Sequence, residues 1–281
     1  MGVLGIDLGG TNVRVGFVEN NSLVRVESLP INKNDDDIIV LNNIYNLIDL
    51  FSKEEVSGIG IGVPSVVDVE RGIVYDVQNI PSWKEVHLKE LVENNFGVPV
   101  YINNDANCFA AGEKYFGKGK DYNNIIGLIV GTGLGAGIVI HGKLYVGKNC
   151  GAGEFGTIPY KDKTYEYFCS GQYFYNEYNT TGEELFKKAT QGDKEAIEIF
   201  SEFGANLGEA IKLIMYSVDP EIIILGGSVS KSFNLFKEKM YKSISNFSYP
   251  KSIENLKIEI SEIDNVAILG AAALYYNDLA K

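Results

Sequence analysis

The chain has 281 residues, of which 45% are hydrophobic and 22% are charged, values typical of a folded globular protein and not of a disordered or fibrous one. Its 37 acidic and 25 basic residues give a formal net charge of -12, which disfavours binding to nucleic acid or to an anionic membrane surface. Three scattered cysteines and two histidines form neither a disulfide framework nor a zinc-ligand pattern.

The length favours two lobes, because single domains most often have about 100 to 150 residues. No uninterrupted apolar run reaches the ~18 to 20 residues needed to span a bilayer, and Met1 leads directly into a strand pattern without a cationic signal-peptide start. We therefore expect a cytoplasmic protein.

Strand and helix signals alternate along the chain, with strands dominating its first part. In chain order, we expect strands at 3–8, 13–18 and 23–28; a helix from the polar cap region 32–37 to about 51; strands at 58–63 and 98–102; a helix at 105–116; strands at 124–131 and 136–141; two helical segments within 183–217; a strand at 221–225; a helix from about 231; a strand at 256–261; and a helix at 266–279. Two glycine-rich turns each join a pair of strands, which indicates a repeated strand-turn-strand unit within an α/β fold.

The first glycine turn follows a buried strand that carries an aspartate near its end, in the segment Gly5-Ile6-Asp7-Leu8-Gly9-Gly10-Thr11-Asn12. Glycines let backbone N–H groups approach a phosphate closely, and Thr11 adds a hydroxyl donor. Asp7 is suited to hold Mg²⁺ directly or through water. We predict that Gly9, Gly10, Thr11 and Asn12 bind nucleotide phosphates, although an ordinary hairpin turn would explain this segment taken alone.

Two further glycine turns repeat this logic. The segment Gly131-Thr132-Gly133-Leu134-Gly135-Ala136-Gly137 joins two predicted strands, and Gly226-Gly227-Ser228 follows another. We predict that Thr132 and Gly133 contact the nucleotide and that Gly226 and Gly227 cradle its adenosine side. Three such turns in one chain favour phosphate binding over ordinary hairpins.

An aspartate lies where a predicted strand passes into a helix, in the segment Asn103-Asn104-Asp105-Ala106-Asn107. A carboxylate at this position accepts backbone N–H bonds and feels the helix dipole, and both effects keep it ionised and oriented. Asp105 is therefore a candidate general base. Helix capping alone would also explain an aspartate here.

The order of these motifs resembles the ROK family of sugar kinases, within the actin-like ATPase superfamily, over nearly the whole chain. The resemblance rests on D-x-G-G-T at 7–11, Gly62-Val63-Pro64 with Asn79 and Trp83, N-D-A-N at 104–107, G-T-G-x-G-x-G at 131–137, Gly153-Glu154-Phe155-Gly156, and Glu166 through Ser170-Gly171. It implies an α/β fold with two lobes of the actin-like ATPase, or ribonuclease H-like, type and an interlobe cleft. The implied small lobe is 1–106, completed by the C-terminal helix 266–281, and the implied large lobe is 107–265.

The same resemblance implies an ATP-dependent hexose kinase that transfers the γ-phosphate to a sugar hydroxyl, O6 of glucose or of a related hexose. Asp105 would be the general base and, with Asn104, Glu154 and Glu166, would bind sugar hydroxyls. ATP and Mg²⁺ are the implied cofactors, and a homodimer is the family expectation. Fructose, allose, mannose or N-acetylmannosamine as acceptor, and polyphosphate as donor, remain open.

The sequence departs from the family pattern at two positions and in one loop. Thr157 replaces a histidine that commonly touches the sugar, and Ser65 replaces a common glycine, so the preferred hexose stays open. The segment between Gly156 and Glu166 is short and contains no cysteine, so we expect no structural zinc. A cluster of aromatic residues lies here, and we expect it to pack as core, with a lining of the sugar site as the alternative: Tyr160, Tyr165, Tyr167, Phe168, Tyr173 and Phe174.

Two other function classes remain as alternatives. A non-catalytic sugar-binding regulator of the same family would couple this body to a helix-turn-helix, and DNA binding by the present chain would then need a separate subunit. A nucleotide-driven scaffold of the superfamily would lack the Asp105, Glu154 and Glu166 set. His87 and His141 have no neighbouring motif and are expected to be structural or surface residues.

Overall fold

The computed structural model of the protein describes residues 1–32, 36–77 and 80–279. Asn79 of the family motif and residues 33–35 of the predicted cap region lie outside the described residues. Among the described helices, none combines the length and apolar character required to cross a bilayer.

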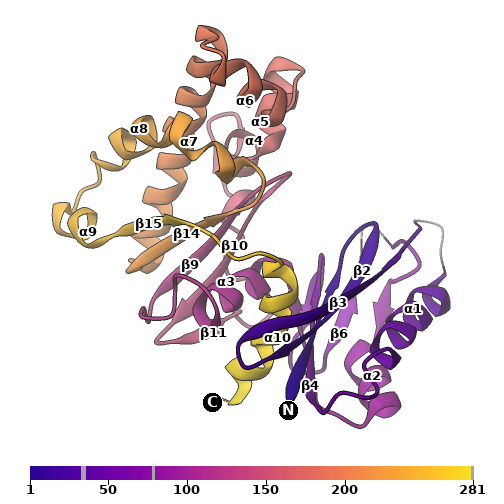
Figure 1. The fold of residues 1–281 in the computed structure, drawn as a ribbon. Coiled ribbons are helices and arrows are strands. Elements are labelled where there is room, and N and C mark those ends of the chain that lie inside the picture. The colour runs from indigo at the N-terminus through magenta and orange to yellow at the C-terminus, as the bar shows by residue number, and fades with distance from the viewer. Residues whose placement is uncertain (33–35, 78–79, 280–281) are drawn as a thin grey trace. The chain divides into compact units, whose positions relative to one another are not determined.

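The chain combines strands and helices throughout its length, as in an α/β fold (Figure 1). The first part contains β1 (Gly2–Leu8), β2 (Asn12–Glu19), β3 (Ser22–Pro30), α1 (Asp37–Asp49), β4 (Val56–Val63), β5 (Val66–Asp68), β6 (Ile73–Tyr75), β7 (Glu85–Val86), α2 (Leu88–Phe96), β8 (Val100–Asn104), α3 (Asp105–Tyr115), β9 (Ile125–Val130), β10 (Leu134–Ile140) and β11 (Lys143–Tyr145). The second part contains a 3₁₀ turn η1 (Phe155–Thr157), β12 (Pro159–Tyr160), β13 (Lys163–Thr164), α4 (Tyr165–Cys169), α5 (Gly171–Tyr178), α6 (Gly182–Thr190), α7 (Lys194–Val218), β14 (Ile222–Gly226), a second 3₁₀ turn η2 (Val229–Ser232), α8 (Phe233–Ile244), α9 (Pro250–Asn255), β15 (Lys257–Ile260) and α10 (Val266–Leu279).

Two mixed five-stranded sheets organise the chain and confirm the predicted fold class. The first has the order β3-β2-β1-β4-β8, in which β1 is antiparallel to β2 and parallel to β4. The second has the order β11-β10-β9-β14-β15, in which β14 runs parallel to both β9 and β15.

Contacts divide the chain into two units. Unit 1 comprises Met1–Asp121, Gly137–Ala152 and Glu262–Lys281, and unit 2 comprises Tyr122–Ala136 and Gly153–Ser261. This division assigns the whole of α3 to unit 1, whereas the sequence-based lobe boundary falls after residue 106. The lobe boundary remains a prediction.

In unit 1, the first sheet is covered on both faces because β1 and β4 alternate large and small residues. Leu4, Ile6 and Leu8 join the core that α1 and α2 complete on one face. On the other face, Gly5 and Gly60 leave room for the backbone of α10, since a Cβ at either position would overlap the carbonyl of Ile268 or Ala271. Figure 1 shows α10 and the α1–α2 pair on opposite sides of these strands.

In unit 2, β14 is buried along its whole length, and the 25-residue helix α7 packs closely against α8. Gly204 and Gly208 permit this close approach, because a Cβ at either glycine would collide with the carbonyl of Phe236 or Met240 in α8. The helical break expected near Gly192 is confirmed, with α6 ending at Thr190 and α7 beginning at Lys194.

The strand expected at 98–102 lies at Val100–Asn104, and the difference has a local cause. Helix α2 continues to Phe96 and ends on Gly97, which takes the left-handed conformation with φ 68°. The strand begins only after this turn. Asn103 and Asn104 therefore belong to β8, and Asp105 begins α3.

Candidate active site

The strand-to-helix junction in unit 1 presents Asp105. Asn104 is the N-cap of α3, because its Oδ1 accepts a hydrogen bond of 2.8 Å from the Asn107 N–H. Capping is therefore the task of Asn104 and not of Asp105. The Asp105 Oδ1 accepts a bond of 2.8 Å from the Ala106 N–H, while the side chain stays accessible at the surface.

The pKa of Asp105 is raised although the residue is accessible. The surrounding protein removes water from the carboxylate, which is the main cause, and the negative charge of Asp7 raises this pKa further. The bond from the Ala106 N–H acts in the opposite direction. The strand register of unit 1 places both predicted carboxylates at the same end of the sheet, because Asp7 pairs with Gly62 of β4 and Gly62 pairs with Asn103 of β8.

Asp7 is held in place by its cross-strand neighbour. It pairs with Arg14 of β2, whose Nη2 and Nε donate bonds of 2.6 and 3.1 Å to the Asp7 Oδ2. Because both bonds use Oδ2, the carboxylate keeps Oδ1 for a hydrated cation. Mg²⁺ is often held by one or two carboxylates, water and substrate phosphates, and the Asp7 Oδ1 fits this donor set.

Hydrogen bonds to the buried Asn103 side chain stabilise the junction of β8 and α3. The Asn103 Oδ1 accepts three bonds: 3.0 Å from the Asn104 N–H, 2.9 Å from the Asn107 Nδ2 and 3.3 Å from the Cys150 Sγ. Asn103, Asn107 and Cys150 are all buried. These side chains fix the residues on either side of Asp105, and they were not predicted as part of the site.

We expect Cys150→Ala to lower the free energy of unfolding by about 1 kcal/mol, because the variant loses one buried hydrogen bond to Asn103. Cys150→Ser restores a donor and should recover most of that loss. Urea denaturation of both variants tests this role of Cys150. Equal stability of the alanine variant and the unmodified protein would contradict it.

The first glycine turn exposes the predicted phosphate ligands. Gly9 N–H donates a bond of 2.9 Å to the Asn12 carbonyl, and the Thr11 carbonyl accepts one of 2.8 Å from the Ile31 N–H. These bonds close the turn with Thr11 and Asn12 at the surface and Gly10 partly exposed. The turn is thus a hairpin in geometry, and the Asn12 Nδ2 donates a bond of 3.1 Å to the Thr11 Oγ1 at its surface.

The other two glycine turns border a pocket of about 620 Å³ in unit 2. Gly131 and Thr132 line it, and the Gly131 carbonyl accepts a bond of 2.7 Å from the Gly171 N–H. Gly227 takes the left-handed conformation with φ 86° against the Val130 carbonyl, which places Ser228 in the wall of the pocket. Gly226 and Gly227 themselves do not line the pocket, whereas the glycines at 131, 171 and 182 do, so no side chain occupies these places in its wall.

Several lining residues of this pocket were not predicted. Tyr175 and Phe186 are 65% and 37% exposed, so each offers an apolar ring face to a flat ligand such as a nucleotide base. Lys231 lines the same pocket and supplies a cation. The volume lies within the range of ~300 to 1,000 Å³ usual for small-molecule sites.

Glu166 links the second glycine turn to the start of α4. Its Oε2 accepts a bond of 3.0 Å from the Leu134 N–H, and its Oε1 accepts one of 3.1 Å from the Gln172 Nε2. Gly133 contacts this carboxylate and does not line the pocket, since a Cβ there would lie 2.5 Å from the Glu166 Oε2. The absence of a side chain at Gly133 therefore leaves room for the Glu166 carboxylate.

A family model described as "ROK family" matches residues 3–278. The chain belongs to the ROK family. A glucokinase of Thermotoga maritima is 28% identical, with 97% of this chain and 96% of the relative covered. A xylose repressor of Caldicellulosiruptor bescii is 29% identical over 99% of this chain and 78% of the relative. A ROK family glucokinase from Streptomyces griseus, solved with glucose and AMPPNP, has a TM-score of 0.79 and 26% identity over 98% of this chain and 99% of its own.

In this ROK protein, Thr157 and Ser65 both direct their hydroxyls to main-chain carbonyls. Thr157 donates a bond of 2.8 Å to the carbonyl of Glu154, the exposed predicted sugar ligand. Ser65 donates to the carbonyl of Tyr75. These hydroxyls thus stabilise local turns.

Only part of the aromatic cluster of this ROK protein packs as core. Phe168, Tyr173 and Phe174 are buried. Tyr160, Tyr165 and Tyr167 are partly exposed, and Tyr160 stacks on Tyr165 with ring centroids 4.3 Å apart. At the turn before α4, the ammonium of Lys161 lies 4.7 Å from the centre of the Phe168 ring. Lys161 also donates a bond of 2.8 Å to the Oδ1 of Asn206, which is 3% exposed. These two contacts of the Lys161 ammonium therefore stabilise this short segment.

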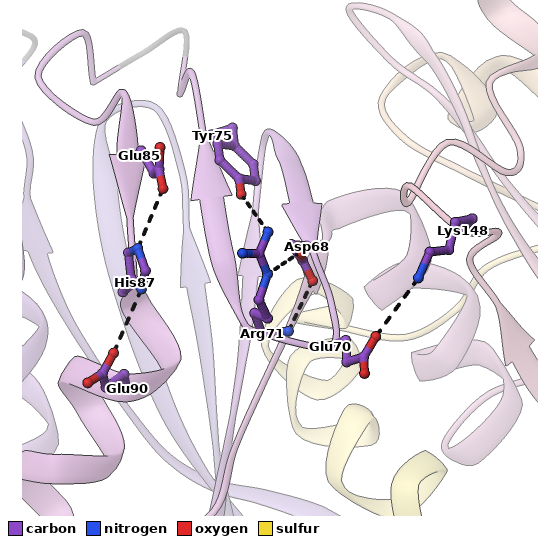
Figure 2. Close-up of polar contacts among 8 residues, drawn as sticks. All are labelled: Asp68, Glu70, Arg71, Tyr75, Glu85, His87, Glu90 and Lys148. Atoms are coloured by element: carbon purple, nitrogen blue, oxygen red, sulfur yellow. Dashed lines mark hydrogen bonds and ion pairs between the residues drawn. The ribbon is translucent and has the colours of Figure 1, made fainter.

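His87 occupies a surface position, in agreement with its expected role. Its ring nitrogens lie 3.5 Å from Glu85 and 3.7 Å from Glu90, and the side chain is 53% exposed (Figure 2). Such exposed pairs contribute little to stability.

Proposed function

We propose that this ROK protein is an ATP-dependent hexose kinase in which Asp105 is the general base. The observation that carries the proposal is the junction of β8 and α3, where Asn104 caps the helix and leaves the accessible Asp105 carboxylate free for another task. The reaction would transfer the γ-phosphoryl group of ATP to O6 of glucose or of a related hexose.

The acceptor side of the proposal rests on amide and carboxylate groups. The Asn104 Oδ1 is occupied by capping, so its Nδ2 is the group left to donate to a sugar hydroxyl. Glu166 is oriented by two donors, and each of its oxygens keeps a lone pair for a hydroxyl. Glu154 is exposed and supplies a further acceptor.

In the proposed reaction, the sugar hydroxyl oxygen forms a bond to the γ-phosphorus while the bond from this phosphorus to the ADP oxygen breaks. The hydroxyl proton passes to the Oδ2 of Asp105, because Oδ1 already accepts the Ala106 N–H. The transition state of phosphoryl transfer is loose, so the proton can move late and a weak base suffices. Bound Mg²⁺ would neutralise charge on the phosphates. Positioning supplies most of the remaining rate gain.

The donor side of the proposal rests on the pocket in unit 2. Its backbone lining at Gly131 and next to Gly227 suits phosphates, and its exposed rings suit an adenine base. Thr11 and Asn12 of the first turn would add donors to the phosphates. Polyphosphate would use the backbone groups but not the rings, so substitution of Tyr175 distinguishes the two donors.

The raised pKa of Asp105 predicts a specific pH dependence. A base acts only when it is ionised, so raising its pKa moves the loss of activity on acidification to higher pH. We expect the acidic limb of kcat/KM, which reports the groups of the free protein, to have an apparent pKa above the ordinary aspartate value of about 3.9. Rates at subsaturating substrate between pH 4 and 8 measure it, with circular dichroism at each pH to exclude unfolding. A limb at or below the ordinary value would contradict the assignment.

The direct test of the function is ADP release with Mg-ATP across glucose, fructose, allose, mannose and N-acetylmannosamine. We expect one hexose to stimulate release at least tenfold over the sugar-free rate, with a sugar phosphate formed in equal amount. The similarity to a xylose repressor supports a second candidate, a sugar-binding regulator. Sugar binding without any stimulated ADP release would favour that candidate and reject the kinase.

A further inference from the structure

A second pocket, of about 760 Å³, lies in unit 1 along the outer edge of β8. Its walls come from the β5–β6 hairpin, from α2, from the loop 146–150 and from the end of α10. None of the residues predicted to bind sugar, nucleotide or Mg²⁺ lines it. Figure 2 shows part of its wall, with Asp68, Arg71 and Tyr75 on the hairpin and Lys148 facing Glu70.

The floor of this pocket is a sheet edge that is already partly capped. Strand β8 is the last strand of its sheet. The Ile59 N–H donates to the Pro99 carbonyl, so the backbone groups of Pro99 face β4. Alternate residues of a strand face opposite edges, so the backbone groups of Val100 and Ile102 point away from β4. The Val100 N–H already donates a bond of 2.9 Å to the Glu93 Oε1. A side chain on the edge discourages the pairing of another strand, so the floor favours a small molecule over a peptide.

The charges around the pocket nearly balance. Three cationic side chains face four carboxylates in its lining: Arg71, Lys89 and Lys148 with Asp68, Glu70, Glu93 and Asp278. The four carboxylates would repel a strongly anionic ligand, and the three cations would repel a strongly cationic one. A neutral ligand avoids repulsion of either kind.

The polar groups of the lining suit a ligand that both donates and accepts hydrogen bonds. The Lys148 and Glu70 side chains are 90% and 87% exposed and only 4.0 Å apart, so this weak pair can turn toward a ligand. Asn103 and Cys150 also line the pocket, but they are buried and the Cys150 Sγ already donates to the Asn103 Oδ1, so the exposed side chains are the groups that would bond a ligand. Lys89 lies 5.9 Å from the centre of the Tyr101 ring, and both residues line the pocket, so the ring offers the pocket an apolar surface. Sugars combine hydroxyls with apolar C–H faces, which matches this mixture of groups.

We propose that this pocket is a second sugar site, which binds an uncharged monosaccharide or disaccharide apart from the acceptor of the phosphoryl group. It has room for a ligand of that size, since small-molecule sites commonly measure about 300 to 1,000 Å³. The presence of the site does not depend on the proposed kinase function, because its residues are separate from the acceptor residues.

Equilibrium dialysis with labelled glucose and labelled maltose tests the site by counting bound sugar per chain. The pocket variants are Lys89→Met, which keeps the stem and removes the charge, and Asp68→Asn, which loosens Arg71. The matched control is Lys84→Met, whose side chain is 75% exposed, pairs with Asp76 and does not line the pocket. Glu154→Ala weakens the proposed acceptor site.

We expect two sugars per chain for at least one of the probes, reduced to one by both pocket variants at concentrations that saturate the unmodified protein. The control should still bind two, and Glu154→Ala should lose the other sugar. A single sugar that only Glu154→Ala removes would overturn the second site and leave the kinase proposal intact. A single sugar that only the pocket variants remove would support the second site and reject the acceptor role of Glu154. Absence of any binding would overturn both.

Discussion

We expect Asp105→Asn to lower kcat by about 100- to 10,000-fold, the range usual for loss of a general base. The amide keeps the size of the carboxylate and can still accept the Ala106 N–H through its oxygen. It cannot take the hydroxyl proton. Because Asn104 caps α3, the substitution should leave the helix and the stability of the protein nearly unchanged. Initial rates of ADP release at saturating sugar and ATP measure the effect.

The matched control is Asp264→Asn, which removes a carboxylate from an exposed position outside the site. Sugar binding by the Asp105→Asn protein should stay within about threefold of the unmodified value, since the lost function belongs to the transition state. A variant that retains more than a tenth of the original kcat would show that Asp105 is not the base. Loss of sugar binding together with kcat would assign it a binding role.

We expect Gly60→Ala to lower the free energy of unfolding by about 3 kcal/mol, within the upper range of overpacking effects. The added Cβ would overlap the Ala271 carbonyl of α10, and a backbone group cannot rotate away as a side chain can. The reduced entropy of the unfolded chain offsets this cost by only about 0.4 to 1 kcal/mol. The steric overlap therefore outweighs the entropy effect, and the substitution destabilises the protein.

Urea denaturation followed by circular dichroism measures this loss, with Gly151→Ala as the control. Gly151 has open space around its position and no positive φ, so alanine there should change stability by less than about 0.5 kcal/mol. If Gly60→Ala were as stable as the control, α10 would not pack on β4 as closely as the structure indicates.

The parts of the site that neighbouring residues build were predictable from sequence. The Asn104-Asp105 corner and the three glycine turns depend on short-range patterns, and each lies where the sequence indicated. Capping was the exception, because the pattern did not decide which of the two residues caps α3. The bond between Cys150 and Asn103 joins residues 47 apart, and no periodicity relates them.

Other parts escaped prediction because their signals are weak or point elsewhere. Strands β5, β6 and β7 have only two or three residues, too few for an alternating pattern. Tyr175 and Phe186 are apolar in a helical context, which favours the core, yet they lie exposed in a pocket wall. Exposure of this kind depends on tertiary packing, which a single sequence does not reveal.

Helix α10 packs on one face of the sheet of unit 1, and this has a consequence for synthesis of the protein on the ribosome. β1 and β4 emerge early, but the helix that covers their glycine-lined face begins about 200 residues after β4 ends. At roughly 5 to 20 residues per second, translation leaves this face uncovered for about 10 to 40 s. A nascent chain in this interval presents apolar strands to chaperones, and a product of premature termination would keep that face exposed and become a substrate for proteolytic quality control.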